Sequence, residues 1–120
     1  MEINLYDKNG YAVAYIADDR EHSIYTWDGH AMCYLVNDMV YGWNGLHLGW
    51  FVNGVVYDVN GYKVGFIKET CPVLTKLPRL KSLKFLKKLK NLRKLPYIRP
   101  WLKFGLSNIL LSDFIRQGEN

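Results

Sequence analysis

The side chains that could do chemistry in this sequence are concentrated in one basic stretch, residues 70–103, which we call the tail. Residues 71–103 contain eleven lysines and arginines and no acid, whereas residues 1–70 contain nine acids and four bases. Clustered cations suit the phosphate groups of nucleic acids or lipids. Opposite charges in one chain also attract each other, so docking of the tail onto the acidic part would explain the asymmetry without a partner.

The candidate interaction residues are the cations of the tail and two aromatic residues that could stack on bases. They are Lys81, Lys84, Lys87, Lys88, Lys90, Arg93, Lys94, Tyr97, Arg99 and Trp101. A second candidate site is formed by Trp27 and Trp43, which hold one position of a sequence repeat. We expect these two tryptophans to be exposed and able to bind a small ligand or a sugar.

Catalysis is not indicated. His22, His30 and His47 have no carboxylate or cysteine at ligand spacing, so we expect no metal, no cofactor and no enzyme activity. Cys33 and Cys71 give no reason to expect a disulfide or an oxidising compartment. No apolar run reaches the roughly 18 to 20 residues of a membrane span. We therefore expect a cytoplasmic, non-enzymatic protein.

The part of the chain before the tail, which must position the candidate residues, contains a fourfold sequence repeat. Four segments share a tyrosine and an Asn-Gly or Asp-Gly pair, and their glycines are Gly10, Gly29, Gly45 and Gly61. Such pairs between β-rich runs are typical of hairpins with two-residue type I′ turns. The repeat predicts an all-β fold in which residues 3–68 form an eight-stranded antiparallel meander.

Four equal hairpins are expected to close around a pseudo-fourfold axis, because an open meander would leave two unpaired edges. One repeat position is always small, which suits close packing of strands. It holds Ala14, Cys33, Gly49 and Gly65. The next position is always aromatic, and we expect its rings to fill the interior. It holds Tyr15, Tyr34, Trp50 and Phe66.

The tail has an apolar residue at every third position from Leu74 onward, often followed by a cation. This spacing drifts around an α-helix but forms one straight ridge on a polyproline II helix. The proline-free part, residues 79–95, is rich in helix formers, so both conformations remain open. An extended run of 27 residues would reach about 80 Å and must project or wrap.

We expect the tail leucines to pack against an apolar surface of this chain or of a second copy, with the lysines facing solvent or the acids of the repeat. Burying a leucine is worth about 1.5 to 3 kcal/mol, whereas an exposed ion pair contributes about 0 to 1 kcal/mol. Leucine burial should therefore decide the path of the tail, and charge should only bias it.

The chain accordingly divides into three parts. Residues 1–69 form the four-hairpin domain, residues 70–103 the tail, and residues 104–120 an apolar C-terminal anchor. The anchor is too apolar to stay in water, so we expect it to dock back, with Ser112 as N-cap of a short helix.

These features resemble the bacterial 4-fold beta flower proteins. The resemblance rests on the repeated Tyr-x-x-Asn/Asp-Gly pattern with its small and aromatic positions, and on the Leu-Lys triads, and it covers the whole chain. It implies four hairpins in a closed arrangement, favours an extended tail and implies no established activity. A rival resemblance is to cell-wall-binding repeats, which set aromatic residues around choline or a glucan. Those repeats are longer and stack as an open spiral.

Two functional hypotheses follow. In the first, the chain is a non-enzymatic scaffold or binding protein, the tail is its interaction element, and its partner is a protein or another copy of itself. In the second, the tail binds nucleic acid or an anionic membrane without sequence preference. No small-molecule substrate is indicated.

Overall fold

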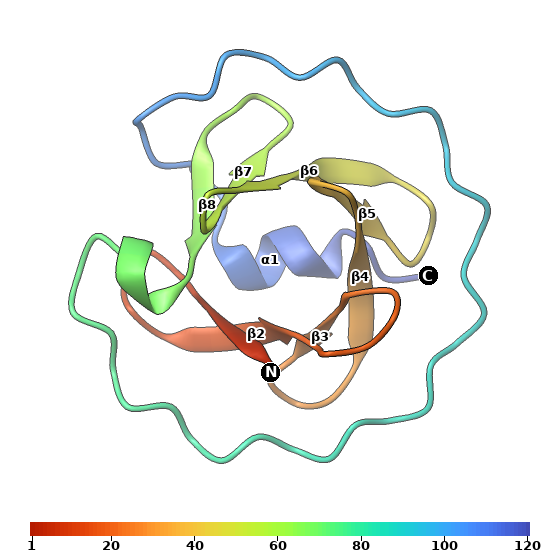
Figure 1. Cartoon of the computed structure of the whole chain (residues 1–120), viewed down its shortest axis with the longest axis horizontal. Helices are drawn as coiled ribbons and strands as arrows, with labels where there is room; N and C mark the ends of the chain where they lie inside the picture. Colours follow the sequence, from red (N-terminus) through yellow and green to blue (C-terminus); the bar gives the residue numbers. More distant parts are fainter.

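The structure, a computed structural model, describes all of residues 1–120. A closed barrel of eight antiparallel strands is followed by a short 3-10 helix, η1, and a single α-helix, α1 (Figure 1). The strands are β1 (Ile3–Tyr6), β2 (Ala12–Ile16), β3 (Ser23–Thr26), β4 (Ala31–Val36), β5 (Met39–Gly42), β6 (His47–Val52), β7 (Val55–Asp58) and β8 (Lys63–Phe66), and the helices are η1 (Lys68–Thr70) and α1 (Leu111–Arg116). The prediction of four hairpins closed into an eight-stranded meander is confirmed.

The hairpin turns share one geometry, which is not the expected type I′. In the first turn the Gly10 amide donates to the Asp7 carbonyl, and the Asp7 amide donates to the Tyr11 carbonyl. Gly10 has a φ of +88°, but Asn9 has no positive φ, as type I′ would require. Each loop is therefore one residue longer and ends on a left-handed glycine, and the register of the hairpin shifts beside it.

The barrel interior is lined by large aliphatic residues that face the small repeat positions. In every hairpin one such pair lies across the two strands. The pairs are Leu5–Ala14, Ile24–Cys33, Val40–Gly49 and Val56–Gly65. A narrow closed sheet has room for one large side chain from each hairpin at this level, which explains why the opposite position must be small.

The aromatic repeat positions lie on the outer face of the barrel, so the prediction that they fill the interior is wrong. Successive strand residues point to opposite faces, and each aromatic residue follows an inward-facing small one. It pairs with a repeat tyrosine across the seam between neighbouring hairpins. From the first to the fourth seam the pairs are Tyr15–Tyr25, Tyr34–Tyr41, Trp50–Tyr57 and Phe66–Tyr6.

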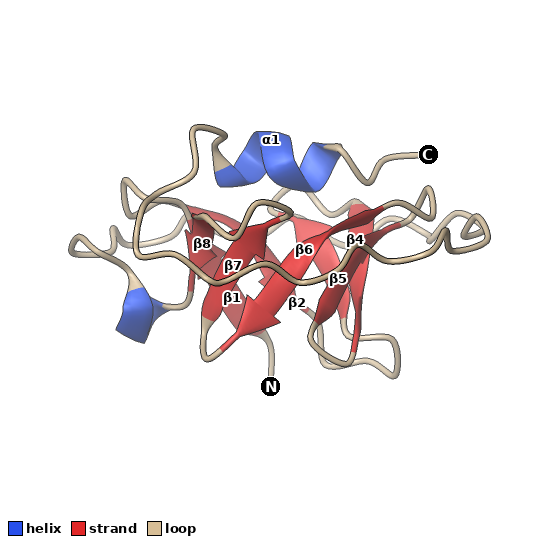
Figure 2. Cartoon of the chain, turned by 90° about the horizontal axis from the view of Figure 1, so that it is seen from above, coloured by secondary structure: helices blue, strands red, loops and turns tan.

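The helix α1 closes one end of the barrel (Figure 2). Leu111, Phe114 and Ile115 are buried among the interior side chains. The C-terminal segment thus docks on the barrel through α1, whereas Phe104, which belongs to the same predicted anchor, is 95% exposed. The helix begins after Leu110, which provides no side-chain cap, so the prediction of Ser112 as N-cap is wrong. Neither helix combines the length and apolar character that crossing a bilayer requires.

The tail runs in an extended path around the outside of the barrel and almost completes a ring (Figure 1). It makes no backbone hydrogen bond to itself, as in a polyproline II helix. At about 3.1 Å per residue, the stretch from Lys76 to Lys103 spans roughly 84 Å. Three quarters of a circle as wide as the molecule, 36 Å, is about 85 Å. The extended, wrapped conformation is therefore the correct one of the two that the sequence left open.

Replacing Gly49 by valine should destabilise the fold by about 1 to 3 kcal/mol, because a Cβ there would collide with the Tyr57 carbonyl. Gly105→Ala is the matched control, since its Cβ would meet only the Tyr62 ring at 3.4 Å. Urea denaturation of both variants gives the comparison. Equal midpoints would show that the third hairpin does not need this close approach.

Candidate functional site

The tail is fastened to the tip of every hairpin by a backbone hydrogen bond. The donors are the amides of Lys76, Phe85, Lys94 and Lys103, and the acceptors are the carbonyls of Gly10, Gly29, Gly45 and Gly61, each at 2.9 Å. Successive donors are nine residues apart, which is three turns of a polyproline II helix for each hairpin. The sequence showed the period of three, but this larger period of nine is the signal that matches the tail to the barrel.

Trp27 and Trp43 hold the tail by hydrogen bonds from their indole groups. Their indole Nε1 atoms donate to the carbonyls of Arg79, at 3.0 Å, and Lys88, at 2.7 Å. These acceptors are again nine residues apart. Both tryptophans are buried, at 8% and 2% exposure. The expectation of an exposed ligand site at these residues is therefore wrong, because the tail covers them.

Lys81 and Lys84 bind the tail to the barrel at the first seam. Each ammonium forms an ion pair with the carboxylate of Glu2 at 2.7 Å. The Lys81 ammonium also lies 4.1 Å from the centre of the Tyr15 ring. A cation over an aromatic face is attracted to its π electrons. The hydrogen bond from Lys81, followed by that from Lys84, holds the pKa of Glu2 below its ordinary value.

Lys87 and Lys90 repeat this arrangement at the second seam. Lys87 contacts Asp19 at 2.8 Å and Glu21 at 3.0 Å, and Lys90 also pairs with Glu21. The Lys90 ammonium lies 4.2 Å from the centre of the Tyr34 ring. The sequence-based expectation that the basic tail docks on the acidic domain is confirmed by these contacts.

The other cations of the predicted interaction set are divided. Arg99 pairs with Asp38 at 3.0 Å, and the Arg93 guanidinium lies 5.7 Å from the centre of the Tyr41 ring. The side chains without an acidic or aromatic partner in the chain are Lys88 and Lys94. Most of the predicted interaction residues thus serve to hold the tail in place.

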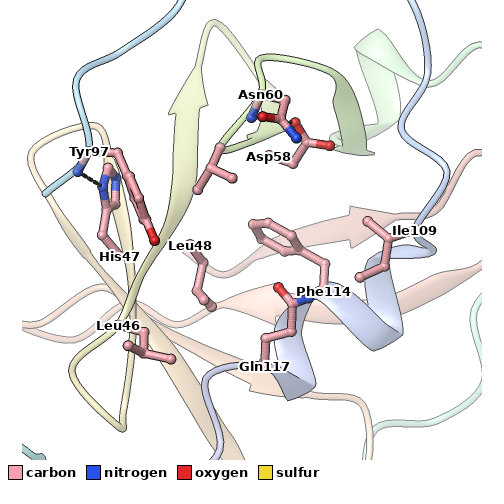
Figure 3. Close-up of a pocket in the computed structure, with 10 residues that line it drawn as sticks. Leu46, His47, Leu48, Asp58, Asn60, Tyr97, Ile109, Phe114 and Gln117 are labelled. Atoms are coloured by element: carbon pink, nitrogen blue, oxygen red, sulfur yellow. Dashed lines mark hydrogen bonds between the residues drawn. The ribbon is translucent and has the colours of Figure 1, made fainter.

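His47 holds the tail at the third seam. Its Nδ1 accepts the Tyr97 amide at 2.9 Å (Figure 3). Its Nε2 donates to the Gly49 carbonyl at 2.9 Å. Burial lowers the pKa of His47, although the bond to Gly49 and the charge of Asp38 act in the opposite direction. The neutral imidazole is the form that this pair of bonds requires.

The apolar row of the tail points away from the barrel. Eleven side chains at every third position are each more than 90% exposed, and together we call them the leucine belt. The belt consists of Leu74, Leu77, Leu80, Leu83, Leu86, Leu89, Leu92, Leu95, Ile98, Trp101 and Phe104. The expectation that the leucines pack against this molecule is wrong.

The orientation follows from the three rows of side chains on a helix with three residues per turn. The residues whose amides bond to the hairpins form one row, and the cations that bond to the acids and rings form a second. The amides of the first row and the side chains of the second are directed toward the barrel. The third row, which carries the leucines, is left facing solvent.

No cluster of three or more His, Cys, Asp or Glu side chains is placed to hold a metal ion. Burial raises the pKa of the Cys33 thiol, which lies in the core and donates to the Ile115 carbonyl at 3.5 Å. A protonated, buried thiol is unreactive.

One comparison with known proteins identifies the family. The family model described as 4-fold beta flower protein matches residues 3–115, nearly the whole chain, and the chain belongs to this family. The searches of curated proteins and of solved structures give no match. Membership therefore supports the fold and leaves the function to be argued from the surface of the molecule.

Replacing Lys94 by proline should loosen the tail and lower stability by about 1 to 2 kcal/mol, because it removes the amide that donates to Gly45. Lys88→Pro is the matched control, since the Lys88 amide makes no hydrogen bond and the extended backbone accepts proline. Limited proteolysis and urea denaturation report the difference. Equal losses in both variants would contradict the anchoring role of the turn glycines.

Acidification through the ordinary histidine pKa near 6.5 should destabilise the protein. The folded-state pKa of His47 is lower than this value, so the unfolded chain binds the proton more readily. The free energy of unfolding therefore decreases as the pH is lowered. His47→Ala uses the residue found at the equivalent positions, Ala12 and Ala31. Its thermal stability should be lower at pH 8 and should change less between pH 7 and pH 5. An unchanged slope would assign the pH dependence to other groups.

Proposed function

We propose that this 4-fold beta flower protein is a non-enzymatic scaffold that binds other protein surfaces through its leucine belt, chiefly by contact with further copies of itself. The observation that supports the proposal is the exposure of eleven apolar side chains, each above 90%, on a tail that backbone hydrogen bonds hold to the barrel. Contiguous apolar surfaces on soluble proteins mark interaction sites. Burying one such side chain is worth about 1.5 to 3 kcal/mol, and no segment of this chain covers them.

The charged surfaces beside the belt argue for a protein partner over a bilayer. Figure 2 shows the tail running between the side with α1 and the side with the N-terminus. The first side carries Asp113 and Arg116, and the second carries Glu2, Asp19 and Glu21. To bring the whole belt into hydrocarbon, one charged side would have to enter as well, at a large cost.

The uniformity of the belt favours contact with copies of the same chain. Its side chains recur about every 9 Å along the tail, three residues at about 3.1 Å each, so the ridge of one copy can interdigitate with that of another. Two convex rims 36 Å wide touch only along a short arc. One contact would bury less than the roughly 1,200 to 2,000 Å² of a stable pair, but several neighbours could cover the rim.

The alternative is nonspecific binding of nucleic acid or an anionic membrane through the tail. Phosphates would have to be met mainly by cations that are not already paired, such as Lys88 and Lys94, because five of the tail cations form ion pairs with carboxylates. We rank this alternative second. The cytoplasm is the compartment that we propose, since both cysteines are free thiols.

Sedimentation velocity over a range of protein concentrations tests the scaffold proposal. The full chain should show species that grow with concentration and do not stop at a dimer. A belt variant with Leu77, Leu83, Leu89, Leu95 and Trp101 all changed to serine should stay monomeric. Because these side chains are exposed, each change should alter the free energy of unfolding by no more than about 0.5 kcal/mol.

A matched charge variant, with Lys88 and Lys94 changed to glutamine, should assemble like the parent protein. A parent chain that remains monomeric at every concentration would contradict the proposal. If that monomer floats with neutral vesicles and the belt variant does not, lipid is the partner. If it binds duplex DNA in a salt-dependent way that the charge variant loses, the electrostatic alternative is correct.

A further inference from the structure

The four seams between neighbouring hairpins are equivalent by repeat, yet they differ in how well they are filled on the side of α1. A cavity of 230 Å³ lies at the first seam, one of 40 Å³ at the second and one of 580 Å³ at the third. At the fourth seam the chain itself enters, and the Lys63 amide donates to Gly105 while the Ser107 amide donates to Lys63. On the side of α1, the third seam therefore has the largest cavity.

The chain uses its own groups to fill the first two seams. Trp27 lines the first cavity, where its indole N–H donates to the Arg79 carbonyl at 3.0 Å. The C-terminal residues Glu119 and Asn120 line the second, and the Asn120 side chain donates to the Leu89 carbonyl at 2.8 Å. An aromatic N–H heterocycle and a carboxamide are thus the groups that these seams accept.

The third seam lacks both of these groups, and there the His47 ring packs edge-on against Trp50 as Trp27 packs against Tyr15. Val59 holds the repeat position that Trp27 and Trp43 hold in the second and third hairpins, and its side chain is much shorter than an indole. The tail carbonyl equivalent to those of Arg79 and Lys88, nine residues further on, is that of Tyr97. This carbonyl accepts no hydrogen bond within the chain.

The walls of this cavity are apolar, with polar groups at the rim. Figure 3 shows Leu48 on one side and Ile109 and Phe114 on the other, with Gln117 beside them. Phe114 is buried, so this wall is a firm part of the barrel core. A volume of 580 Å³ is typical of small-molecule sites.

The ionisable groups at the rim, His47 and Asp58, already form hydrogen bonds within the chain. His47 uses both ring nitrogens, as described above. Asp58 accepts the amides of Asn60 and Tyr62 at 3.0 Å through Oδ1 and the Ser107 hydroxyl at 2.7 Å through Oδ2. The lining contains no lysine or arginine for an anionic ligand, and both oxygens of Asp58 are already engaged by neutral donors.

The polar groups that remain free are uncharged. The side-chain amides of Asn60 and Gln117 and the hydroxyl of Tyr97 line the cavity and have no hydrogen-bond partner in the chain. Each amide offers both a donor and an acceptor. A planar ligand could thus place an apolar ring face against the walls and its polar edge at the rim.

We propose that the third-seam cavity binds an uncharged aromatic heterocycle with a ring N–H, of about the size of an indole. The ring lies beside the short Val59 side chain, against Leu48 and Phe114. Its N–H donates to the free Tyr97 carbonyl, and Asn60 and Gln117 meet its remaining polar groups. This proposal depends on the cavity alone and stands independently of the leucine belt.

Isothermal titration of the full chain with indole tests the proposal. The parent protein should bind indole at sub-millimolar concentration, and Val59→Trp, which supplies the residue of the equivalent positions, should weaken binding at least tenfold. Gln117→Ala changes an exposed side chain, leaves the fold intact and should weaken binding several-fold. Leu86→Ser on the belt is the matched control and should bind as the parent does.

The result is decisive in either direction. Absence of binding by the parent up to about 1 mM indole would overturn the proposal. So would undiminished binding by a Val59→Trp protein that melts like the parent. Should that variant fail to fold, equal affinity of Gln117→Ala and the parent would overturn it instead. Tighter binding of the anionic indole-3-acetate than of indole would contradict the uncharged ligand class.

Discussion

The structure depends on one geometric constraint, the match between a chain with three residues per turn and a barrel with four equal hairpins. Nine tail residues, three turns, reach from one hairpin tip to the next, and the carbonyls of Gly10, Gly29, Gly45 and Gly61 receive an amide at each step. These bonds fix the rotation of the tail about its own axis, and this rotation sets the direction of each row of side chains. The cations of one row reach the acids and rings of the barrel, and the leucine row faces solvent.

The same constraint explains why charge and not leucine burial determines which row faces inward. The outer face of the barrel is a series of aromatic pairs, and lysine suits it well because its aliphatic stem covers a ring while its ammonium reaches a carboxylate. Lys81 on Tyr15 and Glu2, and Lys90 on Tyr34 and Glu21, are examples. Each contact is modest, but they act together with the amide and indole bonds at fixed intervals. The leucines are thereby left available to partners.

The sequence was sufficient to predict the closed barrel, its hairpin order and the docking of the tail on the acidic domain, because repeats, turn residues and charge are local or additive signals. It left the tail open between an extended and a helical conformation. It was not sufficient to predict which face a residue takes. Tyr15 and Tyr34 were expected inside and lie outside, since the strand register is set by the extra turn residue. The belt and the third-seam cavity depend on contacts between distant segments, such as His47 with Tyr97, which no local pattern contains.

Residue-resolved amide hydrogen exchange of the full chain tests the central claim most directly. The account predicts slow exchange in the tail at the amides of Lys76, Phe85, Lys94 and Lys103, and also at Ser82, Asn91 and Tyr97, which donate to the hairpins. The belt amides, including those of Leu83, Leu86 and Leu92, make no hydrogen bond and should exchange quickly. Fast exchange throughout the tail, or continuous protection of the kind a helix gives, would contradict the account.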